Sequence, residues 1–144
     1  MFSKSCNYAI KASIFIARNS LEEKKVGFVD IAKEINSPQA FTAKILQTLV
    51  KSEIIKSSKG VNGGFYIPKN KIVTTYLSQI VTAIDGNSIL NGCGLGLDQC
   101  SKKQPCPVHD KFKSIREDIK QMLRKTNLKE LALGIKSGDT FLKH

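Results

Sequence analysis

The sequence SPQAFTAKILQTLVKSEIIKSSKGVNGGFYI, residues 37–67, decides the fold. It begins with serine and proline, which are favoured at a helix N-cap and at the first helical position. Apolar side chains then recur at intervals of three and four residues, which predicts a helix that runs to about Ser52 with one buried face. These apolar positions are Phe41, Ile45, Leu46 and Leu49.

The hydrophobic period changes after this helix. Residues 53–59 and 65–67 are strand-like, and the glycine-rich residues 60–64 lie between them, so a β-hairpin with a glycine-rich tip is predicted. Upstream, residues 1–19 and 29–36 have helical spacing, and only a tight junction separates the second of them from Ser37. Three helices followed by a hairpin are the order of a winged helix-turn-helix.

Further helices are predicted after the hairpin. Residues 73–84 are amphipathic and end before Gly86, a suitable C-cap, and Asn127 with Glu130 resembles a capping box for a last short helix. Between them, a helix over residues 110–125 has a narrow apolar stripe. Because the compact domain is complete by about residue 84, we expect this stripe to pack against a second copy of the chain.

The expected fold class is therefore mainly α with a small β-hairpin, a winged helix-turn-helix domain plus a long C-terminal dimerisation helix. Three parts are predicted: a DNA-binding domain at residues 1–85, a cysteine-rich cluster-binding loop at 86–109, and the dimerisation helix with a C-terminal tail at 110–144.

Composition and charge narrow the function classes. The 144 residues suit one domain, and 23 Lys+Arg against 12 Asp+Glu give a net charge of +11, spread along the chain. This favours a polyanionic partner, nucleic acid before anionic membrane, although solubility alone is the alternative interpretation. No secretory signal and no apolar run of membrane-spanning length is visible, so a cytoplasmic protein without structural disulfides is expected.

The helix that starts at Ser37 and the hairpin are the candidate DNA-binding surface. In a winged helix-turn-helix, residues near the N-terminus of such a helix meet base edges in the major groove, and lysines meet phosphates. Gln39 and Thr42 are predicted to read bases; an ordinary solvated helix face is the alternative. The full candidate set is Ser37, Gln39, Ala40, Thr42 and Lys44 on the helix, with Lys56, Ser58, Lys59, Asn62, Gly63 and Gly64 on the hairpin.

Three of the four cysteines and one histidine fall in one short segment, spaced Cys93-x6-Cys100-x5-Cys106-x2-His109. Neither cysteine gap has the close spacing that structural zinc sites usually offer, and the C-x-x-C of thioredoxin-like chemistry is absent. Three thiols on a loop that contains glycines could wrap an iron–sulfur cluster. The spacing alone leaves a cluster, zinc and free redox thiols open.

The sequence resembles the Rrf2 family of bacterial transcription regulators, with its iron–sulfur IscR and nitric-oxide-sensing NsrR branches, over roughly residues 1–135. The resemblance is carried by Tyr8-Ala9, by residues 31–34 (IAKE), by the wing GVNGGFYI at 60–67, by the cysteine triplet, and by residues 127–131 (NLKEL). It implies a homodimer that binds a palindromic operator in double-stranded DNA and holds a 2Fe–2S or 4Fe–4S cluster.

The resemblance also implies a ligand set. Cys93, Cys100 and Cys106 fall on the family's three ligand positions. The fourth ligand is His109 if the chain follows the IscR branch. In the NsrR branch the ligand is an acidic residue from the other subunit, and Asn7 stands at the matching position. Two departures are a first cysteine gap of six residues where five is common, and Ala43 where the IscR branch has glutamate.

The sequence thus predicts a DNA-binding transcriptional regulator, a repressor, whose DNA affinity is controlled by an iron–sulfur cluster that senses nitric oxide, redox state or iron–sulfur status. An enzyme is not expected, because no acid–base pair has motif support. The alternatives are a small iron–sulfur redox or electron-transfer protein and a zinc-stabilised DNA-binding protein without a sensing role. Cys6 is expected to be a small buried thiol.

Overall fold

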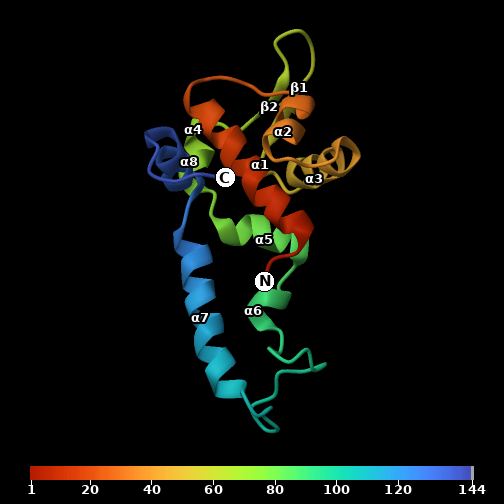
Figure 1. Ribbon diagram of the computed structural model, residues 1–144, viewed down its shortest axis with the longest axis vertical. Helices are drawn as coiled ribbons and strands as arrows, with labels where there is room; N and C mark the ends of the chain where they lie inside the picture. The colour runs from red at the N-terminus through yellow and green to blue at the C-terminus, as the bar shows by residue number, and fades with distance from the viewer. Residues whose placement is uncertain (144) are drawn as a thin grey trace.

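The computed structural model describes residues 1–143 and is mostly helical, with one two-stranded antiparallel sheet (Figure 1), which confirms the predicted fold class. His144, the last residue of the predicted C-terminal segment, lies outside the described residues. The elements are α1 (Lys4–Leu21), α2 (Phe28–Glu34), α3 (Gln39–Lys51), β1 (Lys56–Ser58), β2 (Gly64–Tyr66), α4 (Lys69–Thr74), α5 (Leu77–Asp85), α6 (Ser88–Asn91), α7 (His109–Lys125) and α8 (Leu128–Ser137).

Helix α1 lies at the centre of the winged helix-turn-helix domain, and the other elements of the domain pack around it. Helices α2 and α3 lie on one side of α1 with the hairpin beyond them (Figure 1), and α8 packs against α1. In the hairpin, Lys56 pairs with Tyr66 and Ser58 with Gly64, and the loop segment at Val26 adds an isolated antiparallel bridge to Phe65. This bridge fixes the base of the wing against the body of the domain.

The hydrophobic core joins the predicted DNA-binding part to the C-terminal part of the chain. Burial of apolar side chains is the main driving force of folding, at roughly 25 cal/mol per Å². The core includes the start of α8, so α8 belongs to the body of the domain although it follows the long helix α7. Fully or almost fully buried side chains include Ile16, Ile31, Leu46, Leu49, Ile55, Ile67, Ile80, Leu123 and Leu128.

The start of α3 differs from the prediction that Ser37 caps it and Pro38 is its first residue. Pro38 has extended backbone angles (φ −56°, ψ 140°) and is itself the N-cap, so the helix begins at Gln39. The Pro38 carbonyl accepts the first helical hydrogen bond, from the Thr42 amide at 2.9 Å. The Ser37 hydroxyl donates to the same carbonyl at 3.4 Å and caps no amide of α3.

The single helix predicted over residues 73–84 is wrong, because the chain breaks between α4 and α5. Tyr76 is extended and forms an antiparallel bridge with Asn127, and its amide donates to the Gln79 side chain at 2.7 Å. Two backbone hydrogen bonds flank the bridge, from the Leu77 amide to the Thr126 carbonyl and from the Leu128 amide to the Thr75 carbonyl, at 3.0 and 2.9 Å. The break therefore anchors the junction of α7 and α8.

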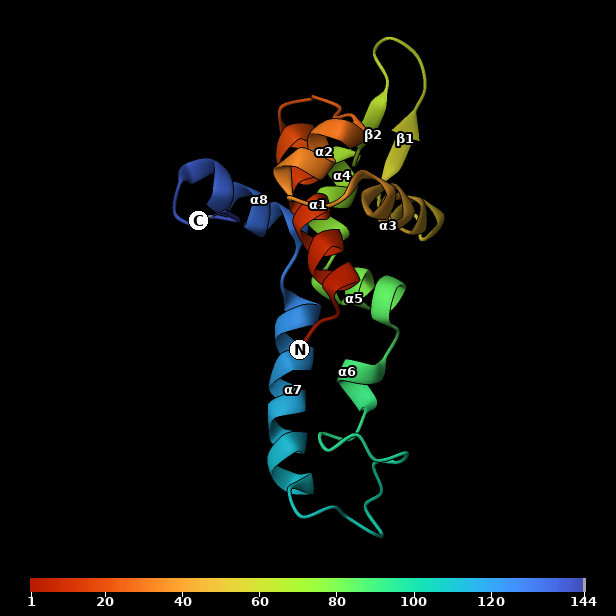
Figure 2. The same ribbon diagram turned by 45° about the vertical axis from the view of Figure 1, so that its right-hand side comes forward.

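Helix α7 extends from this anchored junction away from the winged helix (Figures 1 and 2). Helix α6 packs beside α7. The loop that leads into the first residue of α7 lies at the end of the molecule farthest from the winged helix. The buried residues of α7 are His109 at its start and Leu123 in its last turn. The apolar stripe between them is left largely exposed, with Phe112 36%, Ile115 53% and Met122 48% accessible.

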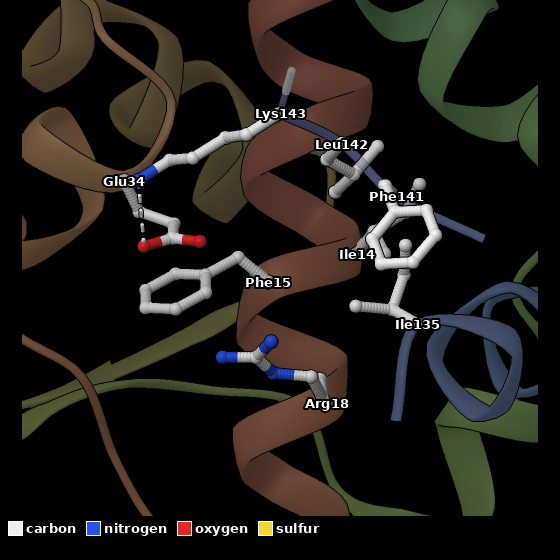
Figure 3. A pocket seen from close by; sticks show the side chains of 8 residues that line it. All are labelled: Ile14, Phe15, Arg18, Glu34, Ile135, Phe141, Leu142 and Lys143. Carbon is white, nitrogen blue, oxygen red and sulfur yellow. Dashed lines mark hydrogen bonds and ion pairs between the residues drawn. The ribbon is translucent and has the colours of Figure 1, made fainter. Parts of the chain in front are cut away.

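The segment after α8 folds back over α1. Lys143 forms an ion pair with Glu34 at the end of α2, 3.3 Å apart, and Leu142 and Phe141 border a cavity of about 190 Å³ against Ile14 (Figure 3). Within residues 1–143, we find no helix whose length and apolar character would let it cross a lipid bilayer.

Candidate nucleic-acid interface and metal centre

Helix α3 presents a polar surface near its N-terminus. Gln39, Ala40 and Lys44 are exposed, as the sequence predicted, and Ser37 just before the helix is half-buried. The expectation that Thr42 faces outward is wrong. Its side chain is fully buried, and its hydroxyl donates to the Pro38 carbonyl at 3.0 Å because its position falls on the inner side of the helix.

The wing carries exposed lysines in and just after β1 and an exposed amide side chain in its tip. Lys56, Lys59 and Asn62 are exposed, whereas Ser58 is half-buried. Residues 39–71 contain six lysines against one acid, Glu53, an excess that suits contact with phosphates. The six are Lys44, Lys51, Lys56, Lys59, Lys69 and Lys71.

Gly63 and Gly64 serve the internal geometry of the wing. A Cβ at Gly63 would lie 2.3 Å from the Ser58 carbonyl oxygen, and one at Gly64 would lie 2.9 Å from the Val26 carbonyl oxygen. Gly64 also has a φ of +141°, which side-chain-bearing residues rarely adopt. These two glycines let the hairpin close on itself and on the loop at Val26.

Lys25 is a residue of this surface that the sequence analysis missed. Its ammonium donates to the Ser58 hydroxyl at 3.1 Å and lies 4.8 Å from the centre of the Tyr66 ring, a cation–π distance. Lys25 therefore braces the outer edge of the wing. The sequence alone does not single Lys25 out, because its place on the wing follows from the pairing of its neighbour Val26 with β2.

The candidate metal centre lies in the loop at residues 92–108, which we call the cysteine strap. Two of the predicted ligands meet where the strap joins α7: the Cys100 Sγ lies 3.4 Å from the His109 Nδ1. His109 is buried, and the three strap cysteines are half-buried and form no disulfide.

Cys93 and Cys106 form the second pair. Hydrogen bonds from the Leu95 and Leu97 amides, and a further one from the Cys106 side chain, hold the pKa of the Cys93 thiol below its ordinary value. The Leu95 amide lies 3.4 Å from the Cys93 sulfur. Backbone N–H groups that point at sulfur stabilise thiolate, the form in which cysteine binds metals.

The structure therefore brings the four predicted donors, three on the strap and His109 on α7, together as two pairs. Among residues 1–143, no three His, Cys, Asp or Glu side chains are close enough to hold one ion in common. Asn7, the other predicted ligand, is exposed near the start of α1. The donor set, three thiols with an imidazole and N–H donors to sulfur, suits an iron–sulfur cluster in its chemistry. To hold one, the strap must bring its two pairs together.

Arg116, which the sequence analysis did not select, joins the strap to α7. Its guanidinium donates to the Gly92 carbonyl oxygen at 2.5 Å and to the Cys100 Sγ at 3.5 Å. One turn earlier on α7, the Phe112 ring lies against Gly94, where an added Cβ would come within 2.3 Å of it. A cavity of about 390 Å³ opens beside these contacts and is lined by Met1, Ile89 and Cys93.

Fold and charge together define a winged-helix DNA-binding protein that carries a cysteine-rich strap. Residues 2–133 match the Rrf2 family model, described as an iron-dependent transcriptional regulator, so the chain belongs to the Rrf2 family. Proteins of this family are transcriptional regulators that bind DNA, and this chain is not an enzyme.

Individual relatives agree with the family assignment. The chain is 29% identical over 133 residues to an HTH-type transcriptional regulator of Aquifex aeolicus, covering 91% of this chain and 90% of that protein. Its fold matches T. potens IscR with a TM-score of 0.76 at 15% identity, covering 98% of this chain and 92% of the other. It also matches CymR, the global cysteine regulator of B. subtilis, with a TM-score of 0.75 at 18% identity, covering 92% and 96%.

Proposed function

We propose that this chain is a homodimeric repressor of the cytoplasm whose affinity for a palindromic operator is set by an iron–sulfur cluster in the cysteine strap. The observation that carries the proposal is the meeting of Cys100 with His109 at the first residue of α7. A group held there touches the helix whose exposed stripe is the candidate dimer interface.

Cys93, Cys100 and Cys106 would hold the cluster, with His109 as the fourth ligand. When bound, the cluster supplies a redox-active centre that iron loss, oxidants or nitric oxide alter. The N–H groups around Cys93 stabilise its thiolate, and the buried imidazole of His109 is oriented toward Cys100. Lys102 and Lys103 on the strap are exposed and add positive charge near the thiols.

DNA recognition is assigned to α3 and the wing. Gln39 would contact base edges and Ala40 a thymine methyl group, while Ser37, Lys44, Lys56, Ser58, Lys59 and Asn62 would contact phosphates. In a two-fold dimer, two such surfaces face half-sites of a palindrome. The strap and His109 would hold the cluster more firmly in one arrangement of the dimer than in the other, so the presence of the cluster would favour that arrangement. DNA affinity could then change by no more than this difference in cluster binding.

The exposed stripe on α7 supports the dimer. Phe112, Ile115 and Met122 are each more than a third accessible on a helix that projects from the body, and Ile119 between them is half-buried. Apolar side chains in such a row are stabilised by burial against a second copy. A regulator that dimerises through α7 would feel any movement of the strap at its interface.

Zinc is the second candidate, because three thiols and one imidazole are also a common donor set of structural Zn²⁺ sites. The electron-transfer alternative is not supported, because the family consists of transcriptional regulators.

Anaerobic purification and metal analysis test the proposal. Wild-type protein should be brown and contain iron and sulfide, and Cys100→Ala should lose the visible absorbance while Cys6→Ala, the matched control, retains it. The holo and apo forms should retard a fragment of the protein's own promoter with different affinities. A colourless protein with stoichiometric zinc would overturn the cluster, and equal affinities of the two forms would overturn the sensing role.

A further inference from the structure

Two contacts, one helical turn apart, attach the cysteine strap to α7. Phe112 packs on Gly94, and Arg116 donates to the Gly92 carbonyl and to the Cys100 sulfur. Residues four apart lie on the same face of a helix, so both contacts act on one side of α7. The first ends beside Cys93 and the second ends on Cys100 itself.

The strap is shaped to receive these contacts. A Cβ on Gly94 would penetrate the Phe112 ring, and a Cβ on Gly92 would lie 2.5 Å from the Ser88 carbonyl oxygen of α6. Glycine at these two positions therefore allows the strap to pass closely between α6 and α7. This close approach is what brings the Gly92 carbonyl within reach of the Arg116 guanidinium.

Arg116 forms no ion pair with a carboxylate among residues 1–143; on α7 the ion pair is between Lys120 and Glu117. Its hydrogen bonds go to the strap, at two acceptors that come before and after the Leu95–Leu97 turn. A planar guanidinium can donate to two separate acceptors in fixed directions, which a lysine ammonium does less well. The positive charge of Arg116 therefore lies beside Cys100, with no carboxylate partner among residues 1–143.

We propose that Arg116, supported by Phe112, is the positioning residue that couples the state of the cysteine strap to α7 and its dimer interface. Arg116 lies directly beside Ile115, the most exposed member of the apolar stripe. A strap that closes around a cluster must move Gly92 and Cys100, and both are tied to this guanidinium. The movement then reaches α7 at the turn that carries the stripe.

The proposal rests on the cluster of the proposed function, and it gives Arg116 a second effect there. Its positive charge lies next to a ligand sulfur, and charge and hydrogen bonding at sulfur tune cluster potentials. Removing the charge makes the reduced, more negative cluster less stable. Arg116→Gln should therefore make the midpoint potential of the cluster more negative. Arg116→Lys keeps the positive charge and should change the potential less.

The test compares Arg116→Gln and Arg116→Lys with Arg124→Gln, an exposed arginine of the same helix that contacts no part of the strap. For each protein we would measure the ratio of holo to apo affinity for the promoter fragment. Allosteric coupling is typically about 5- to 150-fold. Arg116→Gln should bring the ratio close to one with apo affinity unchanged, and Arg124→Gln should retain the wild-type ratio. An unchanged ratio and potential in Arg116→Gln would overturn the proposal.

A cluster-independent measurement separates this inference from the proposed function. In apo protein, trypsin cleavage after Lys102 and Lys103, followed by mass spectrometry, reports how firmly the strap is held. Arg116→Gln should be cleaved several times faster there, and Arg124→Gln at the wild-type rate. Faster cleavage in a protein that takes up no cluster would preserve the anchoring role of Arg116 and reject the cluster; equal cleavage rates would reject the anchor.

Discussion

The Cys100 Sγ lies 3.4 Å from the His109 Nδ1, and His109 is both buried and the first residue of α7. This contact connects the middle of the cysteine strap to the start of the long helix. A ligand fixed by burial on a helix end is better positioned than one on an exposed surface. It gives a physical reason to prefer His109 over Asn7 as the fourth ligand.

We expect His109→Ala to lose its cluster to a chelator roughly tenfold or more faster than wild type, because the fourth ligand is removed and loss of even an outer-shell partner of a ligand costs about 10- to 100-fold. Asn7→Ala is the matched comparison, since its side chain is exposed on α1. The rate is followed as loss of visible absorbance under anaerobic conditions. If Asn7→Ala is the faster variant, the ligand comes from the partner subunit.

Lys59 at the wing tip tests the DNA surface. Lys59→Gln should weaken binding to all DNA sequences alike and reduce the slope of log affinity against log salt by about 0.9, since one phosphate contact is lost. Lys129→Gln on α8 removes the same charge from another face of the domain and is the control. Fluorescence anisotropy at several salt concentrations measures both. An unchanged slope in Lys59→Gln would remove the wing from the interface.

Thr42 should matter for stability and not for sequence reading. Thr42→Val removes the hydrogen bond to the Pro38 carbonyl, which should lower the free energy of unfolding by about 1 kcal/mol, without altering operator preference. By contrast, Gln39→Ala should lower discrimination between operator and a mutated half-site by about 1–3 kcal/mol. Urea unfolding and competition binding measure the two effects. A loss of specificity in Thr42→Val would return this residue to the DNA-contacting surface.

The fold was largely predictable because its signals are local. The 3-4 spacing from Phe41 to Leu49 and the glycine-rich hairpin identified the winged helix, and Gly86 is the C-cap of α5 as expected. The burial of Thr42 was missed because threonine is polar, although it lies three, four and seven residues before Ile45, Leu46 and Leu49 and therefore on the same buried face of α3. The break at Tyr76 was missed because its partner, Asn127, is far away in the sequence.

The candidate site also has residues that the local sequence predicts and residues that only the folded structure identifies. The sequence identified Cys93, Cys100, Cys106 and His109 as candidate ligands, because cysteine and histidine commonly bind metals and these four lie close together in the chain. Arg116 has no such signal, since a basic residue on a charged helix is ordinary. Its role depends on a contact with Gly92 that follows from how the strap folds back between α6 and α7.

Cys6 should be the least reactive of the four cysteines. It is fully buried, and that burial, with Asp85 beside it, raises the pKa of its thiol to about 12 from the ordinary value of 9.0. Since the thiolate is the nucleophile, iodoacetamide at pH 8 should label the three strap cysteines of native apo protein and leave Cys6 unlabelled until the protein unfolds. Peptide mapping identifies the labelled sites. Labelling of native Cys6 would show that the α1–α5 contact opens readily.

The exposed stripe on α7 gives the last prediction. Ile115 is 53% accessible, and a lysine in its place would put a charge into the proposed dimer interface, where it would lose water without a partner. Ile115→Lys should therefore be a folded monomer by sedimentation equilibrium, with far-ultraviolet circular dichroism unchanged. Ser114→Lys introduces the same side chain at an exposed position about a third of a turn away and should remain dimeric. Because a monomer presents one winged helix, Ile115→Lys should also bind a single half-site as well as it binds the full palindrome; a dimeric Ile115→Lys would place the interface on another surface.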